Sequence, residues 1–425
     1  MQSKRRILLT SHGSTGDIYP VIRLGRELRD RGHDVRMATT VFFQKEVEEA
    51  GLRFIRLPPD WDQTGLAEAM RELSKARDGL DVLGKIYREA KPFIDEIITT
   101  LDAELADRTD LFVCSYVFSP MSHLARARGI PCAVTTFAHN VVPSPLYPPD
   151  RLPTLRLWPR PLQKLWNRFL WIAGERLVCW TINRTIGEGL HRHKVPPARG
   201  FFLDPADLAL VTVSPALFEP AELWHDRFRF TGYLRWQAAE KPEMESVLNT
   251  FTGGQPVPIL TFGSVTFEEA RHVMTRFMSN WPKGKKIIVQ SGWARLTIEK
   301  PGEEELVVGK MSHDQLFRHG SVIIHHGGAG TTASALHSGR PQIIIPHLGD
   351  QFFFADEIER LGVGHKLGRR RWPEKLPALV RKIEATPAFT AKARAHAATL
   401  AGENGPAMAA GLLEEMVRMR KTLSP

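Results

Sequence analysis

The sequence is poor in cysteine and has no long apolar run. Only three of its 425 residues are cysteines, Cys114, Cys132 and Cys179, and none has the spacing of a metal site. Reduced core residues of a cytoplasmic protein explain them better than a disulfide framework does. No apolar run reaches the roughly 18 residues that a membrane span requires. The first residues lack the apolar region and cleavage site of a secretory signal, so we expect a cytoplasmic protein.

Two common binding signatures are also missing. The first glycine-containing loop, Ser11 to Asp17, does not have the G-x-G-x-x-G spacing of dinucleotide-binding proteins, which argues against a nicotinamide enzyme. The formal charge of +10 is compatible with nucleic acid, an anionic lipid surface or an anionic substrate as partner. No helix-turn-helix, zinc-finger or RNA-binding signature accompanies this charge, so we expect no nucleic-acid partner.

The length and the pattern of elements predict two domains. A chain of 425 residues is too long for one core, and strand and helix patterns alternate along it as in doubly wound α/β domains. We predict a first domain over 1–236, a polar linker over 237–255 and a second domain over 256–405. A helix pattern over 406–425 ends the sequence.

The stretch 321–351 is predicted to bind a phosphate. An apolar strand pattern at 322–324 precedes a glycine-rich loop, a helix that starts at Thr331 and a second strand pattern at 343–345. Unpaired N–H groups and the helix dipole at such a helix start favour an anion. Asp350 and Gln351 follow the second strand and fall on the same edge of the sheet. An ordinary strand–helix–strand unit with a glycine-rich turn is the structural alternative.

The N-terminal strand and loop carry a conspicuous acid. Residues 7–10 predict a strand, 11–17 a loop, and Pro20 the start of a helix. Asp17 therefore falls at the carboxyl end of the first strand, where small-molecule sites are usually built. From its position alone, Asp17 is equally a helix-capping residue.

Residues 151–194 alternate tryptophans with arginines and lysines. We expect two amphipathic helices that pack on the first domain, an arrangement that also allows them to line an acceptor site. Peripheral contact with a membrane surface is the alternative.

Several motifs in combination resemble a known family. HHGGAGTT at 325–332, PHLGDQ at 346–351, GSTGDIYP at 13–20 and FGS at 262–264 resemble the nucleotide-sugar-dependent glycosyltransferases of the GT-B fold, family 1. The resemblance is to the branch that contains sterol glucosyltransferases, glycopeptide glycosyltransferases and rhamnosyltransferases. It implies two Rossmann-like domains facing across a cleft, with the acceptor bound by the first and the donor by the second. It also implies that the helix over 406–425 packs back on the first domain; an independent helix is the alternative.

The resemblance further implies roles for individual residues. Asp17 would be the general base, and His326 would contact the donor α-phosphate, whereas His325 ends the strand as a core residue. The other implied donor-binding residues are Ser264, Trp293, Met311, Gly328, Gly330, Thr331, Thr332, Asp350 and Gln351. The residues implied near the acceptor are His12, Phe137 and His139.

The implied reaction is an inverting, metal-independent transfer of a hexose, from UDP-glucose in the first place, to a hydroxyl of a flavonoid, sterol, lipid or polyketide. No cofactor beyond the donor is expected. Plant relatives carry a ribose-binding glutamate where this chain has Ser334, so a dTDP-rhamnose-dependent rhamnosyltransferase is the alternative. A GT-B nucleotide-sugar epimerase and a non-catalytic nucleotide-sugar or lipid-binding protein are more distant alternatives.

Overall fold

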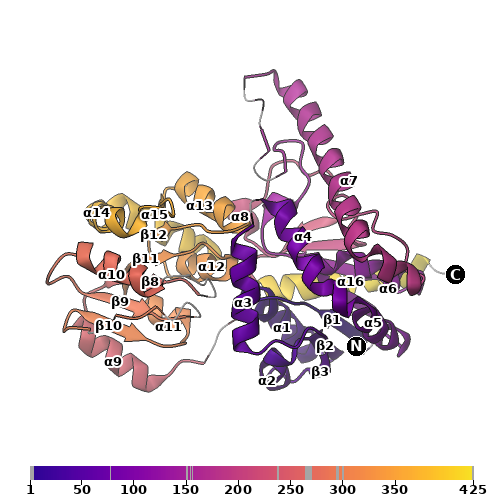
Figure 1. The fold of residues 1–425 in the computed structure, drawn as a ribbon, viewed down its shortest axis with the longest axis horizontal. Helices are drawn as coiled ribbons and strands as arrows, with labels where there is room; N and C mark the ends of the chain where they lie inside the picture. Colours follow the sequence, from indigo (N-terminus) through magenta and orange to yellow (C-terminus); the bar gives the residue numbers. More distant parts are fainter. Residues whose placement is uncertain are drawn as a thin grey trace. The chain divides into compact units, whose positions relative to one another are not determined.

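Two all-parallel β-sheets form the centres of two units of the chain (Figure 1). Unit 1 comprises Met1–Leu66, Ala76–Leu234 and Asn404–Pro425, and unit 2 comprises Ala67–Lys75 and Arg235–Glu403. The predicted α/β class with two doubly wound sheets is confirmed. The structure is a computed structural model that describes residues 4–76, 78–149, 152–153, 155, 157–236, 239–263, 270–292, 296–298 and 301–423.

The sheet of unit 1 has seven strands in the order β3-β2-β1-β4-β5-β6-β7. The strands are β1 (Arg6–Thr10), β2 (Asp34–Thr39), β3 (Arg53–Arg56), β4 (Leu111–Ser115), β5 (Cys132–Thr136), β6 (Leu208–Val211) and β7 (Phe228–Phe230). Ile7 of β1 is in register with Val35 of β2 on one side and with Leu111 of β4 on the other. Because β1 lies between β2 and β4, the strand order reverses there, and the loops after β1 and β4 diverge to opposite faces of the sheet.

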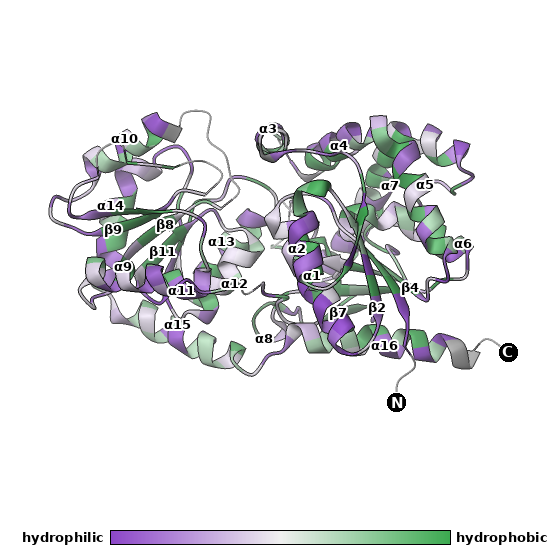
Figure 2. Ribbon diagram, turned by 90° about the horizontal axis from the view of Figure 1, so that it is seen from below, coloured by the Kyte–Doolittle hydropathy of each residue, from purple (hydrophilic) through white to green (hydrophobic). Residues whose placement is uncertain are grey.

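Helices flank both sheets (Figure 2), and the central strands β4, β5 and β6 are buried throughout their length. This is the pattern of parallel strands that are covered on both faces. The helices of unit 1 are α1 (Thr15–Asp30), α2 (Gln44–Glu49), α4 (Gly79–Ala90), α5 (Ile94–Ala106), α6 (Ser122–Ala127), α7 (Arg160–Arg192), α8 (Pro215–Phe218) and α16 (Gly405–Leu423). Helix α3 (Gln63–Ser74) crosses the division between the units.

The sheet of unit 2 has six strands in the order β10-β9-β8-β11-β12-β13, which reverses between β8 and β11. The strands are β8 (Val257–Thr261), β9 (Ile287–Gln290), β10 (Glu305–Val308), β11 (Gly320–His325), β12 (Gln342–Ile344) and β13 (Gly364–Lys366). Ile324 of β11 pairs with Leu260 of β8 and with Ile343 of β12.

Two apolar clusters cover the two faces of this second sheet. One gathers Phe277 of α10 and Leu376 of α14 under the sheet, and the other gathers Leu248 of α9 and Phe317 of α11. The helices of unit 2 are α9 (Pro242–Thr252), α10 (Ala270–Asn280), α11 (His313–Phe317), α12 (Ala329–His337), α13 (Asp350–Leu361), α14 (Trp372–Glu384) and α15 (Pro387–Leu400).

The sequence pattern predicted that helix α1 starts at Pro20, but the helix begins five residues earlier, at Thr15. Ser14 is the N-cap residue, and its Oγ accepts a hydrogen bond from the N–H of Gly16 at 3.3 Å. Asp17 sits in the first turn and accepts from the N–H of Ser14 at 2.8 Å, which completes a capping box. The first turn is therefore fixed by Ser14 and Asp17, and Pro20 lies inside the helix.

Helix α9 lies within the range 237–255, which the polar composition predicted as a linker. Its start has proline in the first turn and two acidic residues, and its end is capped by Gly253 at a φ of 61°. Leu248 is fully buried in the core of unit 2. Met244 and Phe251 pack partly buried against the same cluster. The polar residues, Pro242 and the two glycines at 253–254 suggested a linker, although the apolar spacing and the end signals of a helix are present in the sequence.

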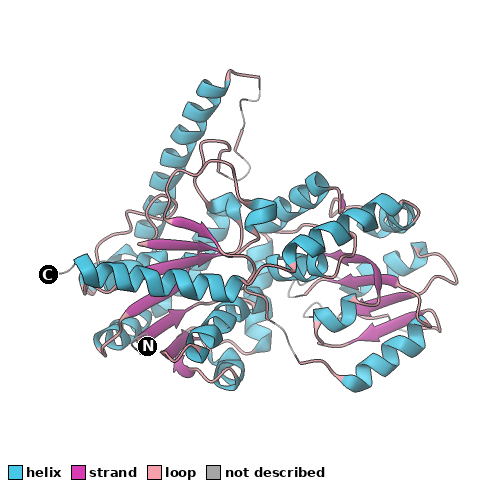
Figure 3. Cartoon of the chain, turned by 180° about the vertical axis from the view of Figure 1, so that it is seen from behind, coloured by secondary structure: helices cyan, strands magenta, loops and turns pink. Residues whose placement is uncertain are grey.

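Helix α7 is a single helix of 33 residues where two shorter helices were predicted. No proline interrupts the sequence from 162 to 192, so nothing breaks the backbone ladder. Its later turns pack against α4 and α5. At Gly189 an added Cβ would lie 2.5 Å from Ile94 of α5, so the two helices approach closely. The first turns of α7 extend beyond the other elements of unit 1 (Figures 1 and 3).

Helix α16, at the end of the chain in Figure 3, belongs to unit 1 and packs against α1. Glu414 accepts a hydrogen bond from Arg31 at 3.1 Å and pairs with Nε2 of His33 at 3.0 Å. Leu413 is fully buried. The helix thus forms part of the core of unit 1, although unit 2 precedes it in the sequence.

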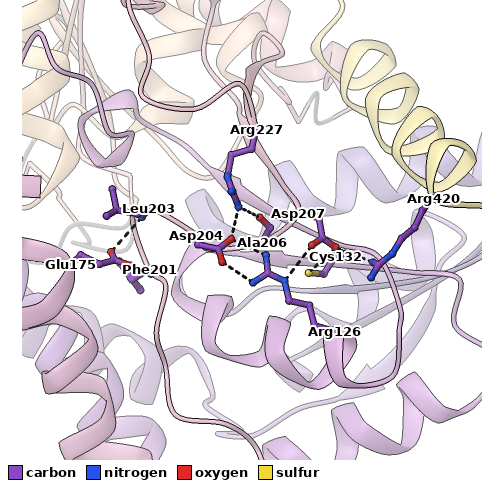
Figure 4. A network of polar contacts seen from close by, with 10 residues as sticks. All are labelled: Arg126, Cys132, Glu175, Phe201, Leu203, Asp204, Ala206, Asp207, Arg227 and Arg420. Carbon is purple, nitrogen blue, oxygen red and sulfur yellow. Dashed lines mark hydrogen bonds and ion pairs between the residues drawn. The ribbon is translucent and has the colours of Figure 1, made fainter. Parts of the chain in front are cut away.

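A polar network joins α6, β5, α16 and the segment before β6 within unit 1 (Figure 4). Arg126 donates to Asp204 at 3.0 Å and to Asp207 at 3.3 Å. Asp207 also accepts from the N–H of Cys132 at 3.0 Å and from Arg420 of α16 at 3.1 Å. Cys132 is buried, and burial, together with the charge of Asp207, raises the pKa of its thiol to about 12. The network has a structural role, and the thiol is inert at neutral pH.

Candidate active site

In each unit, the predicted site residues gather at the point where the strand order reverses. In unit 1, the loop after β1 leads into α1 and the loop after β4 leads into η3 (Tyr116–Met121). In unit 2, Phe262 and Gly263 follow β8, and His326 follows β11. Ligands of doubly wound sheets bind in the crevice outside the carboxyl ends of the strands at such a point.

Asp17 is held by the residue that caps its own helix. The N–H and the hydroxyl of Ser14 both donate to Oδ2 of Asp17, at 2.8 and 2.9 Å. The hydroxyl of Ser11 donates to the backbone carbonyl of Asp17 at 2.9 Å. Burial raises the pKa of the Asp17 carboxyl, and the hydrogen bonds from Ser14 oppose this rise. The group is therefore more basic than an ordinary aspartate.

Gly13 provides the space that this carboxylate occupies. Its φ is +128°, and an added Cβ would lie 2.5 Å from Oδ2 of Asp17. No other residue fits this position without moving the carboxylate, because a side chain here has neither the conformation nor the room.

His12 lies between two aromatic residues of unit 1. Its ring centroid is 5.4 Å from that of Trp61 and 6.5 Å from that of Phe118 in η3. Both ring nitrogens are inaccessible to solvent and have no hydrogen-bond partner among the described residues. Desolvation lowers the pKa of His12 to about 4, against a small opposing effect of Asp60, so the ring is neutral at physiological pH.

The other two residues implied near the acceptor follow β5. Phe137 is partly exposed directly after the strand, and His139 opens the short helix η4 (His139–Val141). The side chain of His139 lies outside the described part of the structure.

The two histidines after β11 have different environments. His325 is fully buried; its Nδ1 accepts from the N–H of Gly327 at 3.1 Å, and its Nε2 lies 2.8 Å from Oε1 of Gln342. These two contacts fix the proton on Nε2. Burial lowers the pKa of His325 to about 4. His325 is thus a hydrogen-bonded core residue, as predicted.

His326 instead lies among glycines at the start of α12. An added Cβ would lie 2.5 Å from its ring at Gly328 and 3.0 Å from it at Gly263. Its Nδ1 is buried and makes no hydrogen bond to the described residues. Burial, and then the neighbouring His325, lower the pKa of His326 well below the ordinary value, so that the ring is neutral.

Helix α12 has no side chain capping its first turn. Gly328 is the N-cap residue and makes no side-chain hydrogen bond, so the first N–H groups of the helix are open to a ligand. The helix begins at Ala329, two residues before its predicted start at Thr331, because Gly328 already accepts from the N–H of Thr332 at 2.9 Å. Gly330 is exposed. The hydroxyl of Thr332 is buried and has no hydrogen-bond partner in the described structure.

The loop before α13 touches the glycine loop of unit 2. Oε1 of Gln351 accepts from the N–H groups of His347 and Leu348, at 2.8 and 3.1 Å. An added Cβ at Gly327 would lie 3.1 Å from the carbonyl oxygen of Gln351. Asp350 is the first residue of α13 and is partly exposed. The two motifs at 325–332 and 346–351 are thus brought together within unit 2.

For three of the predicted donor-binding residues, the structure shows no position beside the glycine loop. Met311 is 9% exposed, and its side chain packs with Val308 and Leu316 in the core cluster below the sheet. Ser264 and Trp293 lie outside the described residues.

Comparison with known proteins identifies the family. Residues 7–97 match the glycosyltransferase family 28 N-terminal domain, and residues 301–416 match the C-terminal domain of the erythromycin biosynthesis protein CIII-like family. The vancomycin aglycone glucosyltransferase of Amycolatopsis orientalis is 27% identical over 438 residues, which cover 99% of this chain and 100% of that protein. The chain belongs to family 1 of the GT-B glycosyltransferases.

Other relatives agree with this GT-B glycosyltransferase assignment. A sterol 3-beta-glucosyltransferase of Arabidopsis thaliana is 26% identical over 381 residues, which cover 84% of this chain and 59% of that protein. The crystal structure of the glycosyltransferase of kitacinnamycin superimposes with a TM-score of 0.71 at 19% identity, over 98% of this chain and 100% of that one. The GT-B fold is therefore confirmed, and the protein is a nucleotide-sugar-dependent glycosyltransferase enzyme rather than a non-catalytic binding protein.

The structure adds residues to which the sequence analysis assigned no role. Ser14 holds the carboxylate of Asp17, and the S-x-x-D spacing of a capping box was available in the sequence to predict it. Trp61 and Phe118 flank His12, but they are distant in sequence and no local pattern connects them. His347 lies 5.7 Å from the ring of Phe262, and burial lowers its pKa to about 4.

Proposed function

We propose that this GT-B glycosyltransferase transfers a hexose, with inversion, from a nucleotide diphosphate sugar to a hydroxyl of a lipophilic or aromatic small molecule. The observation that carries the proposal is the held carboxylate of Asp17 at the carboxyl end of β1. The named relatives support the substrate class, because one glucosylates a glycopeptide aglycone and the other a sterol.

Asp17 serves as the general base in this proposal. The acceptor oxygen forms a bond to the anomeric carbon while the bond from that carbon to the phosphate oxygen breaks, and the hydroxyl proton passes to the carboxylate. Ser14 donates twice to Oδ2, so Oδ1 is the oxygen that takes the proton. Burial raises the pKa of the Asp17 carboxyl, which makes its carboxylate a stronger base than that of an ordinary aspartate. Attack opposite to the leaving phosphate inverts the anomeric centre.

The start of α12 is proposed to stabilise the leaving nucleoside diphosphate. The open N–H groups of its first turn and the helix dipole favour the negative charge that develops there. The buried hydroxyl of Thr332, with Thr331 beside it, adds a donor. His326 is neutral, so its contribution is a hydrogen bond from the imidazole rather than a full positive charge. These donors perform the role without a metal ion or cofactor.

Asp350 and Gln351 are proposed to bind the donor sugar. The Oε1 atom of Gln351 is engaged by the backbone of His347 and Leu348. The amide nitrogen is therefore the part of Gln351 that donates to a sugar hydroxyl, whereas the carboxylate of Asp350 accepts from one.

UDP-glucose is the proposed donor, because both named relatives are glucosyltransferases. Ser334 in α12 stands where plant relatives have a glutamate that hydrogen-bonds the ribose. The nucleoside is therefore open, and dTDP-rhamnose is the alternative donor. A panel of UDP-glucose and dTDP-rhamnose with flavonoid, sterol and hydroxy-fatty-acid acceptors, analysed by mass spectrometry, separates the two. Donor incubated alone reveals any epimerase activity as a new sugar isomer.

The substitution Asp17→Asn tests the assignment of the base. The amide that replaces the carboxylate keeps an oxygen that can accept from Ser14, so we expect normal folding and donor binding, with transfer reduced roughly 10²- to 10⁴-fold. Calorimetric titration with the donor nucleotide and rates of glycoside formation measure the two effects. Asp30→Asn, at the far end of the same helix, is the matched control and should retain activity. Full turnover by Asp17→Asn would exclude Asp17 as the base.

A further inference from the structure

Helix α7 has a second apolar face that points to solvent. Its members recur at three- and four-residue spacing apart from one step of five between Ile172 and Leu177, so they lie along one side of the helix. We call this the α7 outer face; its residues are Leu162, Leu165, Phe169, Ile172, Leu177 and Trp180. Leu165 is 65% exposed, Phe169 57% and Trp180 56%. Directly before the helix, Leu157 is 99% exposed. Single exposed apolar residues are ordinary, but a continuous row of them along one helix marks an interaction surface.

The opposite face of α7 already anchors the helix to unit 1. Trp171, Ile182 and Ile186 are buried, and the N–H of the Trp171 indole donates to the carbonyl oxygen of Tyr147 at 2.9 Å. The side chain of Glu175 points inward as well, and it accepts from the N–H groups of Phe201 and Phe202 at 2.7 and 2.6 Å. The fold of unit 1 is therefore secured without the outer face.

The exposed charges of this helix are positive up to Arg184, and the exposed acid Glu188 follows only near its end. Between residues 157 and 187 the only acidic residue is Glu175, which is buried. The basic residues of the same stretch are Arg160, Lys164, Arg168, Arg176 and Arg184. Lys164 pairs with Glu222, whereas Arg160 and Arg176 are exposed, and the guanidinium of Arg184 lies 5.1 Å from the ring centre of Trp180. Cations thus accompany the apolar row along its length.

We propose that unit 1 adsorbs to an anionic lipid bilayer through the α7 outer face. A helix with tryptophan, phenylalanine and leucine on one side and arginines at its flanks lies in the interface of a bilayer, where the apolar side chains enter the acyl boundary and the cations meet phosphate groups. The helix lies on the membrane rather than through it, because no helix in the described ranges is long and apolar enough to cross one.

A second copy of the chain is a poorer occupant of this face. A two-fold pairing places the same residues against each other. It would bring two sets of arginines together, and the one exposed acid of α7, Glu188, lies near the far end of the helix and is paired with Arg192. An anionic surface matches both the apolar row and its charge. The inference does not depend on the identity of the donor or the acceptor.

Co-sedimentation of the full chain with vesicles tests the proposal. We expect binding to vesicles of phosphatidylcholine and phosphatidylglycerol in equal parts, little binding to phosphatidylcholine alone, and weakening as salt is added. The double variants Leu165→Ser/Phe169→Ser and Arg176→Gln/Arg184→Gln should each bind the mixed vesicles about tenfold or more weakly.

Matched controls lie elsewhere on the surface. Val247→Ser removes an apolar residue that is 43% exposed in α9, and Lys45→Gln removes an exposed cation of α2; both should bind as the unchanged chain does. Unchanged thermal unfolding of the variants confirms their fold. Failure of the unchanged chain to bind mixed vesicles overturns the proposal, as does equal binding by both double variants. A concentration-dependent dimer in light scattering that Leu165→Ser/Phe169→Ser abolishes would instead assign the face to a second copy.

Discussion

The carboxylate of Asp17 caps its own helix, and its proposed role as the base depends on that contact. As a partner of Ser14 it closes the first turn of α1, and this same contact fixes the direction of the group that is proposed to take the acceptor proton. Sequence position left the capping and the catalytic readings equal. The capping contact uses Oδ2 of the carboxylate and leaves Oδ1 for the proposed proton transfer.

The pH dependence of transfer should reflect the raised pKa of Asp17. The base acts only when ionised, so kcat/KM should fall as the pH decreases through the pKa of the free enzyme. Because burial raises this pKa, the fall should begin at a higher pH than for an ordinary aspartate of pKa about 4. Initial rates from mildly acidic to mildly alkaline pH measure it. A rate that stays constant down to about pH 4 contradicts the prediction.

Stability provides an independent check on the same group. A carboxyl whose pKa is higher in the folded than in the unfolded state destabilises the fold once the pH exceeds the folded pKa, and this cost disappears below the unfolded pKa. Asp17→Asn should therefore unfold at a temperature no lower than the unchanged chain at neutral pH, and any advantage should vanish near pH 3, roughly.

At the level of elements, Gly328 links the start of α12 to the imidazole of His326. In Gly328→Ala the new methyl group would lie 2.5 Å from Nε2 of His326, so the ring must move. We expect the KM for the donor to rise about tenfold or more, since a displacement of the binding group costs affinity, with a small effect on folding. Steady-state kinetics with varied donor measure this. Gly411→Ala in α16 is the control, because its methyl group meets nothing within 4 Å; equal KM values in both variants would contradict the prediction.

Helix α9 offers a direct test of whether residues 242–252 belong to the core of unit 2. Leu248 is fully buried there, and its neighbour Val247 is 43% exposed. Leu248→Ala should destabilise the unit by roughly 2–5 kcal/mol because it leaves a cavity, whereas Val247→Ala should change stability by less than about 0.5 kcal/mol. Urea unfolding followed by fluorescence compares them. Equal midpoints for the two variants would mean that the range behaves as a linker.

The elements differ in how far the sequence could predict them. The central strands and the glycine loops of both sheets were predictable, because buried parallel strands form short apolar runs and glycine loops follow them. The edge strands β3, β7 and β13 were not, because their sequences RFIR, FRF and GHK are not apolar runs. The continuous helix α7 was not, because apolar residues on both of its faces obscure a single helical stripe. The apolar residues on the exposed face, which made the helix hard to predict, are those that we propose contact the lipid bilayer.

The candidate site could also be predicted only in part from the sequence. His325 and His326 are adjacent, and the family resemblance implied that His325 is the core residue. The structure gives the physical difference, because the ring of His325 is hydrogen-bonded to Gln342 and that of His326 lies among glycines. The contact of His12 with Trp61 and Phe118 joins three separate segments of unit 1. No local pattern records such a contact, since tertiary packing alone creates it.

At the scale of the whole molecule, unit 1 is completed by a helix that follows unit 2 in the sequence. Leu413 of α16 is fully buried, whereas Met408 of the same helix is 54% exposed. Leu413→Ala should therefore loosen unit 1 by roughly 2–5 kcal/mol, and Met408→Ala should not. Because α16 belongs to unit 1, hydrogen exchange should accelerate in β1, β2 and β4 but not in β8 or β11. Hydrogen-exchange mass spectrometry resolves the two sheets. Faster exchange confined to β8 and β11 would place the helix in the stability of unit 2 instead, and no change in either sheet would show that α16 behaves as an independent helix.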